Sequence, residues 1–289
     1  MSTAALWVRG ARPRTLGAGI VPVVVGTAAA GSATWPRALG ALAVALGLQV
    51  GVNYANDYFD GTRGVDSGGR AGPPRLTASG AAPARLVLAA AAASFAIAGV
   101  AGAWLALATE PWLLSLGALA IAAALTYSGG PRPYAGLGLG ELSVLLFFGF
   151  LAVCGTAYVQ HGSVTADAWW AAGPVGLLAV AILMANNVRD ADTDAAAGKR
   201  TLAVRLGNRA SRALFRVTVA LALLLPVLAV ATGAASVAWL LTLTALPLAA
   251  GPLISIGYAV GPELIRTLNN TAMLHAQFGA MLAIALWMS

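Results

Sequence analysis

The sequence predicts an all-α, polytopic membrane protein whose nine transmembrane helices form one bundle. Of its 289 residues, 59% are hydrophobic and only 9% are charged, and the mean hydropathy is +0.81. Roughly a quarter of the residues in a soluble globular domain are charged, so this composition excludes that class. The apolar tracts run for about 17 to 22 residues, the length that a helix needs to cross hydrocarbon, whereas barrel strands are about half as long and alternate in polarity.

Nine apolar tracts rich in Ala, Leu, Val and Gly account for the bundle in chain order. The first follows Arg9, Arg12 and Arg14 but is of full length, and no small-residue cleavage site ends a short apolar core, so we expect it to be retained rather than cleaved as a signal. The fourth tract is the shortest. We expect the helices at 15–31, 37–55, 85–105, 112–127, 139–160, 168–187, 212–231, 235–256 and 269–288. Residues 1–289 then form a single transmembrane domain.

The net charge of +7 arises from 17 basic and 10 acidic residues. If the loops between nine helices alternate across the bilayer, every Lys and Arg except Arg37 falls on one side. By the positive-inside rule that side is cytoplasmic, which leaves the N-terminus inside and the C-terminus outside. The basic balance therefore reflects topology, and we expect no nucleic acid partner.

Two long polar segments, 56–83 and 186–211, follow the second and sixth tracts on the cytoplasmic side. Together they hold six of the ten acidic residues, namely Asp57, Asp60, Asp66, Asp190, Asp192 and Asp194. The pair Asn56 and Asp60 recurs as Asn186 and Asp190, an interval of 190 − 60 = 130 residues. This recurrence predicts two pseudo-repeated four-helix units plus one further helix, related by an axis along the membrane normal.

The acidic segments have the pattern of metal sites. Helical spacing places Asn53, Asn56, Asp57 and Asp60 on one face, and it stacks Asn186, Asp190 and Asp194 along another, with Asp192 pointing elsewhere. Such closely packed carboxylates beside hydrocarbon need compensating cations. Mg²⁺ prefers oxygen ligands and bridges carboxylates to phosphates, and the sequence has no His or Cys cluster that would favour zinc. We predict two magnesium sites around one polyanion, with the ligands Asn56, Asp57, Asp60, Asp66, Asp190 and Asp194.

Basic side chains next to these motifs suit a diphosphate. Lys199 is the only lysine among 17 basic residues, and it follows the second acidic stripe directly. The loop 127–134, rich in Gly and Pro, either covers the site or is only a tight interhelical turn. We predict catalytic roles for Asp57, Asp60, Asp190, Asp194 and Lys199, and substrate contacts for Asn53, Asn56, Arg63, Tyr127, Arg132, Tyr134, Asn186, Arg189 and Arg200.

Four sequence motifs carry a resemblance to a known family. They are Ala-Arg-Pro-Arg-Thr-Leu at 11–16, Asn-Asp-Tyr-Phe-Asp at 56–60, Tyr-Ser-Gly-Gly-Pro-Arg-Pro-Tyr at 127–134, and the stretch 186–207. Over essentially its whole length the sequence resembles the UbiA-type intramembrane prenyltransferases, whose two aspartate motifs follow the second and sixth of nine helices. That family usually has a further Asp where this chain has Gly64, with Asp66 two residues later. The branch acting on 1,4-dihydroxy-2-naphthoate shows the same displacement.

The resemblance implies Mg²⁺-dependent transfer of a prenyl chain from a polyprenyl diphosphate to 1,4-dihydroxy-2-naphthoate, with loss of carbon dioxide, to give demethylmenaquinol. It implies a multi-pass protein of the cell membrane, in contact with the lipid bilayer, whose active-site loops are cytoplasmic. Arg132 is the candidate partner of the acceptor carboxylate. The rings of Tyr58, Phe59 and Tyr134 are expected to shield the allylic cation from water.

Other functions stay open at this point. A prenyltransferase of the same family could act on 4-hydroxybenzoate, homogentisate, haem, chlorophyllide or a glycerol phosphate. A transporter or magnesium channel is the alternative of another class, although its carboxylates should line a path at mid-bilayer, whereas these cluster at one membrane face. A lipid-binding scaffold derived from the enzyme is a third. Apolar residues are interchangeable in a tail site, so the sequence does not define the prenyl chain length.

Overall fold

The computed structural model describes residues 3–64 and 75–289, and every regular element in those ranges is helical. The α-helices are α1 (Thr3–Ala11), α2 (Gly17–Ala29), α3 (Trp35–Thr62), α4 (Ala84–Ala108), α5 (Leu113–Ser128), α6 (Gly140–Val144), α7 (Ala152–His161), α8 (Ala166–Ala196), α9 (Leu202–Ala231), α10 (Leu246–Ser255) and α11 (Leu264–Trp287). A π-helical stretch, Leu145–Leu151, joins α6 to α7, and 3-10 turns occupy Pro13–Thr15, Tyr134–Leu137, Val237–Ala245 and Gly261–Glu263. The all-α class is confirmed.

Six helices of the described ranges are long and apolar enough to cross a bilayer. They are α3, α4, the continuous helix 140–161, α8, α9 and the helix 237–255. The helices α2 and α5 are also apolar but have only 13 and 16 residues, and α11 has 24. Large apolar side chains such as Val100 and Leu107 are 73% exposed, as expected where hydrocarbon rather than water surrounds a helix. The chain is therefore an integral membrane protein.

The first part of each polar segment, 56–62 and 186–196, continues the preceding helix instead of forming a loop. The helix α3 runs to Thr62 rather than to 55, and α8 runs to Ala196 rather than to 187. Each ends just before a glycine with a left-handed backbone, Gly64 (φ 73°) and Gly198 (φ 75°), which is the usual residue at that position after a helix. No glycine with a left-handed backbone and no proline stands between the start of each polar stretch and these glycines, so the helix continues through the polar residues.

The structure corrects the start of one further predicted span and the type of helix within two others. The helix α9 starts at Leu202, ten residues before the predicted 212, and bends at Gly207 (φ 76°, ψ 168°). The predicted span 139–160 contains the π-helical stretch, and the predicted span 235–256 begins with a 3-10 segment. π-Helical turns displace side chains from the regular register and are frequent at functional sites. Here the stretch carries Phe147 and Phe148, which line the cavity described below.

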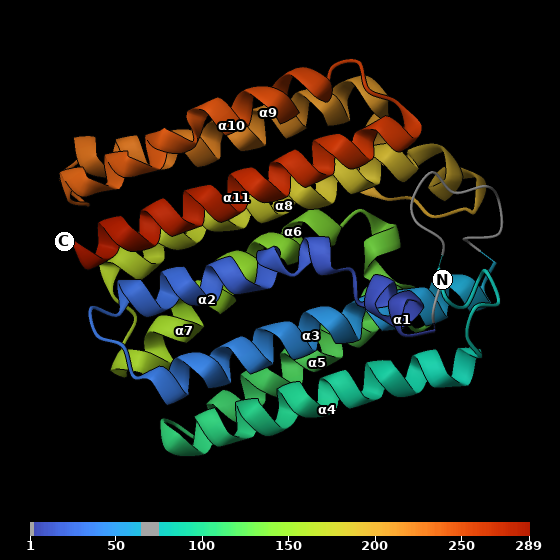
Figure 1. Cartoon of the computed structure of the whole chain (residues 1–289), viewed down its shortest axis with the longest axis horizontal. Helices are drawn as coiled ribbons and strands as arrows, with labels where there is room; N and C mark the ends of the chain where they lie inside the picture. Colours follow the sequence, from blue (N-terminus) through green and yellow to red (C-terminus); the bar gives the residue numbers. More distant parts are fainter. Residues whose placement is uncertain (1–2, 65–74) are drawn as a thin grey trace.

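The helices lie side by side, with α8 in the interior of the bundle (Figure 1). It is the most buried of the six long helices. It packs on α9, α11 and α2, and their side chains form the largest apolar core. The backbone of α8 also meets that of the π-helical stretch at Gly176 and Gly149. The two are so close that a Cβ atom on Gly176 would lie 2.8 Å from the Cα atom of Gly149. A second core joins α3 to α4 around Tyr54, Val87 and Phe95.

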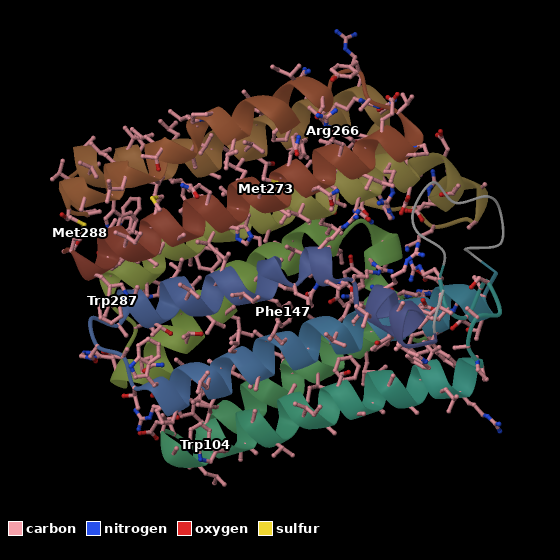
Figure 2. The ribbon with its side chains drawn as sticks, viewed as in Figure 1. Trp104, Phe147, Arg266, Met273, Trp287 and Met288 are labelled. Carbon is pink, nitrogen blue, oxygen red and sulfur yellow. The ribbon has the colours of Figure 1, made fainter. Side chains whose placement is uncertain are left out.

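The two ends of the bundle differ chemically. The helix α1 lies across the end of α3, where the Tyr54 hydroxyl donates to the Trp7 carbonyl (2.9 Å) and the two rings meet edge to face. At the opposite end lie Trp104 and Trp287 (Figure 2), both exposed, in the manner of an interfacial aromatic belt. Both acidic motifs lie at the α1 end, because they end α3 and α8. The bundle therefore presents both acidic motifs at the same end.

Candidate active site

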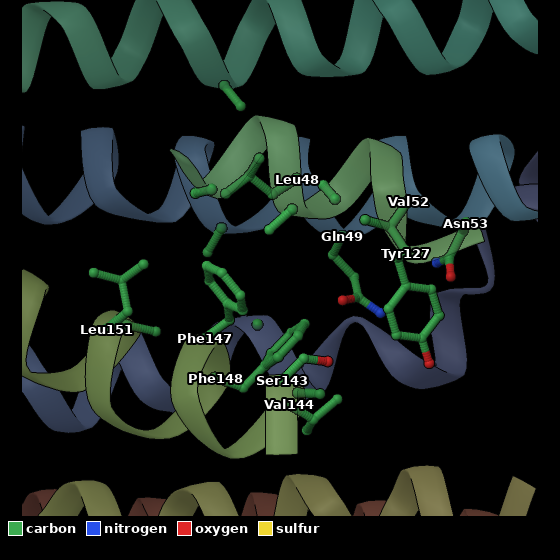
Figure 3. Close-up of a pocket in the computed structure, with 18 of the residues that line it drawn as sticks. Leu48, Gln49, Val52, Asn53, Tyr127, Ser143, Val144, Phe147, Phe148 and Leu151 are labelled. Atoms are coloured by element: carbon green, nitrogen blue, oxygen red, sulfur yellow. The ribbon is translucent and has the colours of Figure 1, made fainter. Parts of the chain in front are cut away.

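One cavity of about 560 Å³ lies between the two apolar cores and receives residues from both acidic motifs. The helices α2, α3, α4, α5, α7 and α8 and the π-helical stretch form its walls. Most of the wall is apolar, with Leu48, Phe147, Phe148 and Leu151 on facing helices (Figure 3). Polar side chains gather toward the α1 end. The cavity is thus amphipathic, with room for a hydrocarbon chain leading to a charged head group.

Three predicted residues of the first motif line this cavity: Asn53, Asn56 and Asp60. The Asn53 amide also donates to the Ala11 carbonyl (2.9 Å), and this bond ties the end of α1 to α3. Within the described residues, the buried side-chain oxygen of Asn56 has no hydrogen-bond partner. The Asp60 carboxylate receives Arg75 at 3.2 Å and Lys199 at 3.4 Å.

Asp57 does not line the cavity, although it was predicted as a metal ligand and catalytic residue. Neighbouring helical residues are about 100° apart around the axis, so Asp57 stands at the edge of the stripe centred on Asn56 and Asp60. Its carboxylate accepts the backbone N–H groups of Leu76 and Thr77, both at 2.8 Å. The predicted ligand Asp66 lies outside the described residues.

The second motif faces the same cavity from α8. Asn186, Asp190 and Asp194 all line it. The Arg189 guanidinium donates to both carboxylate oxygens of Asp190 and to the Asn186 side chain, each at 2.7 Å, but does not itself line the cavity. Asp192 is exposed, as predicted from its helical phase. The i, i+4 reading of this motif therefore matches its geometry.

Lys199 joins the two motifs across 139 residues of sequence. Its ammonium nitrogen lies 3.4 Å from a carboxylate oxygen of Asp60 and 3.9 Å from one of Asp194. The left-handed Gly198 ends α8 and turns the chain back over its last turn, where the Lys199 N–H donates to the Asp194 carbonyl (2.8 Å). The neighbouring Arg200, a predicted substrate contact, is exposed and does not line the cavity.

The loop 127–134 lies partly over the site. Tyr127 and Tyr134 line the cavity with perpendicular rings 5.4 Å apart. Burial raises the pKa of the Tyr134 phenol, which therefore stays protonated and able to donate at neutral pH. Arg132, by contrast, is exposed and outside the cavity lining.

Three other predicted contacts also lie outside the cavity. Arg63 donates to the carbonyls of Ser128 (2.8 Å) and Gly130 and stacks over the Phe59 ring at 5.7 Å, so it ties the end of α3 to the loop. Tyr58 and Phe59 pack against each other edge to face rather than toward the substrate space. Of the three rings expected to shield a cation, the structure brings only Tyr134 into the cavity.

Residues that sequence reasoning missed complete the polar wall: Arg12, Gln49 and Arg75. Gln49 precedes Asn53 by one helical turn on the same stripe of α3, and it points into the cavity beside Tyr127 (Figure 3). This spacing was available in the sequence. Arg12 has a left-handed backbone (φ 54°), a strained conformation that tends to occur at functional sites. Arg12 belongs to the motif at 11–16 that carries the family resemblance, whereas Arg75 has no sequence signal that distinguishes it from an ordinary topology charge.

Glu141 contributes indirectly. It is buried, and it accepts a hydrogen bond at 2.9 Å from the side chain of Asn187, which lines the cavity. The charged side chains that line the cavity are the carboxylates of Asp60, Asp190 and Asp194 and the cations of Arg12, Arg75 and Lys199. These three positive and three negative charges balance. The cations give a polyanion its partners, and the carboxylates give a divalent metal its ligands.

The donor set also fits magnesium. The described residues contain no group of three or more His, Cys, Asp or Glu side chains that would hold a metal on their own. Mg²⁺ is usually held by one or two carboxylates together with waters and substrate phosphates. The unbonded Asn56 oxygen and the carboxylates of Asp60, Asp190 and Asp194 offer such ligands in one cavity. They fit a metal that the bound substrate helps to hold.

An all-α membrane protein with two acidic motifs at the head of an apolar cavity has the form of an intramembrane enzyme whose substrate joins an anionic head group to a hydrocarbon chain. Residues 19–263 match the UbiA prenyltransferase family, and the chain belongs to that family. It is 48% identical to the 1,4-dihydroxy-2-naphthoate octaprenyltransferase of Mycobacterium tuberculosis over 94% of both chains. It is 30% identical to the protein of the same name from Bacillus subtilis over 96% of this chain and 91% of that relative.

Two solved structures share the fold. A UbiA homolog from Aeropyrum pernix superposes with a TM-score of 0.73 at 21% identity, covering 93% of this chain and 97% of the other. A UbiA homolog from Archaeoglobus fulgidus, bound to DMAPP and Mg²⁺, superposes with a TM-score of 0.64 at 18% identity, covering 98% and 99%. The family assignment thus agrees at the level of sequence and of fold.

Proposed function

We propose that this protein transfers the polyprenyl group of a polyprenyl diphosphate to 1,4-dihydroxy-2-naphthoate, releasing diphosphate and carbon dioxide and forming demethylmenaquinol for menaquinone synthesis. The observation that carries the proposal is the position of Lys199 between Asp60 and Asp194, which joins both acidic motifs in one amphipathic cavity. The names of the relatives at 48% and 30% identity support the same acceptor.

The donor lies with its diphosphate at the polar end and its hydrocarbon among the apolar walls. Asn56, Asp60, Asp190 and Asp194 are the residues that would hold Mg²⁺. When bound, the metal neutralises the charge that develops on the departing diphosphate. Lys199 supplies a fixed cation beside the departing diphosphate. Its electrostatic stabilisation of that charge is strongest where water is excluded.

The reaction needs no oxidant. The allylic C–O bond breaks and its electron pair leaves with the diphosphate. The electron-rich ring carbon that bears the carboxylate forms the new C–C bond, and loss of carbon dioxide restores the aromatic ring. Tyr134 and the apolar wall exclude water from the allylic carbon. Because Arg132 is exposed, we propose Arg12, Gln49 and Tyr127 as the acceptor contacts in its place.

We also propose nine membrane-spanning helices arranged as two four-helix repeats plus one. The nine predicted tracts overlap helical segments within the described ranges, and the two acidic motifs end α3 and α8 in the same way, before Gly64 and Gly198. The charged end, with the N-terminus, then faces the cytoplasm, and the protein resides in the cell membrane.

An acceptor panel tests the activity. Purified protein in detergent receives a polyprenyl diphosphate with either 1,4-dihydroxy-2-naphthoate or 4-hydroxybenzoate, with Mg²⁺ or with EDTA, and the products are separated by chromatography. We expect Mg²⁺-dependent demethylmenaquinol formation from the naphthoate alone. Product from 4-hydroxybenzoate only would assign the protein to the other acceptor class. No prenyl transfer by folded protein would favour a transporter or scaffold.

A further inference from the structure

Asp57 is a buried acid that the mechanism above does not use. Its side chain belongs to the first acidic motif, yet the residue is only 3% exposed and lies outside the cavity lining. One carboxylate oxygen accepts the N–H of Leu76 and the other accepts the N–H of Thr77, both at 2.8 Å. Charge-assisted bonds of this kind are among the strong hydrogen bonds of proteins. Asp57 therefore binds the backbone of its own chain, 19 and 20 residues further on.

The bound segment is packed as well as hydrogen-bonded. Leu76 is 3% exposed and belongs to the core between α3 and α4. Gly61 on α3 and Gly10 on α1 leave room for it, since a Cβ atom on Gly61 would lie 2.7 Å from the Thr77 Cβ atom, and one on Gly10 would lie 2.7 Å from a Leu76 methyl group. The path of residues 75–77 is thus fixed from both sides.

Arg75 immediately precedes this fixed pair. Its guanidinium lines the cavity, is buried, and donates to the Asp60 carboxylate at 3.2 Å. The contacts form one chain, from the Asp57 carboxylate through the backbone of Leu76 and Thr77 to Arg75, and from Arg75 to Asp60. If Asp57 turned to a metal instead, the buried N–H of Leu76 and the partly buried N–H of Thr77 would lose their acceptor, and an unpaired buried N–H is rare in proteins.

We propose that Asp57 is a positioning residue rather than a metal ligand, and that it acts by holding Arg75 against Asp60. Arg75 in turn orients the Asp60 carboxylate toward the head group of the donor. The proposal rests on the proposed function, because it assigns the use of Asp60 in that reaction. Removal of a residue that hydrogen-bonds to a metal ligand and orients it typically lowers metal affinity or activity by about 10- to 100-fold.

The kinetic test is a double-mutant cycle on the full-length protein in detergent. Asp57→Asn and Arg75→Lys should each lower kcat/KM for prenyl transfer by about 10- to 100-fold, with a smaller rise in the Mg²⁺ concentration for half-maximal rate than Asp60→Asn causes. The double variant should be no slower than the slower single variant, because both changes break one chain of contacts. Asp60→Asn, which removes a proposed ligand, should raise the Mg²⁺ requirement.

A test independent of activity is hydrogen exchange of the backbone, followed by mass spectrometry on peptides that contain residues 76 and 77. In protein without metal or substrate, Asp57→Asn should speed exchange there by about tenfold. The exposed Asp192→Asn variant should leave it unchanged. If the wild type proves inactive on every acceptor, the proposed function fails, and this exchange measurement still tests the tether.

Three results would overturn the proposal. One is a rise in Mg²⁺ requirement for Asp57→Asn as large as that for Asp60→Asn, which would make Asp57 a ligand. Another is a double variant whose loss is the product of the two single losses. The third is wild-type kinetics in Arg75→Lys, which decides the matter even if Asp57→Asn does not fold.

Discussion

Helical phase decides which acidic residues can take part in chemistry. Asn56 and Asp60 on α3 and Asp190 and Asp194 on α8 line the cavity, whereas Asp57 and Asp192, one or two positions away, do not. The sequence predicts this division well for the second motif, where the i, i+4 spacing is strict. The sequence does not predict that Asp57 lies outside the cavity. A residue at the edge of a helical stripe can face either way, and its neighbours in the folded chain decide which. For Asp57 those neighbours are the backbone N–H groups of Leu76 and Thr77.

Lys199 and Arg200 provide a matched pair at the residue scale. Lys199→Ala should raise KM for the polyprenyl diphosphate by about 10- to 100-fold, since a charge-assisted contact is worth about 1.5–3 kcal/mol and each 1.4 kcal/mol is a factor of ten. Arg200→Ala should stay within about threefold, because its side chain is exposed and outside the cavity. Steady-state kinetics at saturating acceptor measures both. Equal losses would contradict the assignment of Lys199 as the bridge between the motifs.

At the scale of elements, apolar tracts locate the helices but not their ends. Hydropathy ends the second and sixth tracts where polar residues begin, yet both helices continue to the glycines that stop them. The π-helical stretch that brings Phe147 and Phe148 to the cavity has no sequence signature, since it depends on the fit of the helix against α8. Close packing there relies on glycine at both crossing positions.

The crossing of α8 with the π-helical stretch predicts a stability effect. Gly176→Ala places a methyl group 2.8 Å from the Gly149 Cα atom, and overpacking of this kind costs about 1–3 kcal/mol. We expect thermal unfolding in detergent at a temperature lower by about 2–10 °C. Gly117→Ala is the control, because nothing lies within 4 Å of its Cβ position. Alanine is a better helix former than glycine, so Gly117→Ala should not lower the unfolding temperature. A decrease as large as that for Gly176→Ala would contradict the explanation by close packing.

At the scale of the whole molecule, the charged and apolar ends of the cavity follow from how the helices assemble. The helix α1 and the end of α11 lie at opposite ends of the bundle (Figure 1), as an odd number of spans requires. The number of predicted helices places the termini at opposite ends, and the charge asymmetry predicts which end is cytoplasmic. The cavity itself was not predictable, because contacts such as Lys199 with Asp60 join positions 139 residues apart and depend on the assembled bundle.

Cysteine labelling tests the orientation. In a Cys154→Ala background, a membrane-impermeant maleimide added to intact cells should modify a Ser289→Cys variant but not an Ala195→Cys variant, which lies at the charged end of α8. Permeabilised cells should allow both. The reverse pattern in intact cells would invert the orientation, and labelling of both or neither from outside would contradict an odd number of spans.

We propose that the two acidic motifs form one magnesium-dependent prenyl transfer site. The most direct measurement compares demethylmenaquinol formation by wild type, Asp190→Asn and Asp192→Asn under identical conditions, with Mg²⁺ or EDTA. We expect EDTA to abolish the wild-type rate, Asp190→Asn to lower it by about 100-fold or more, and Asp192→Asn, exposed one half-turn away, to stay within about threefold. Equal activity of the two variants, or full activity in EDTA, would contradict it.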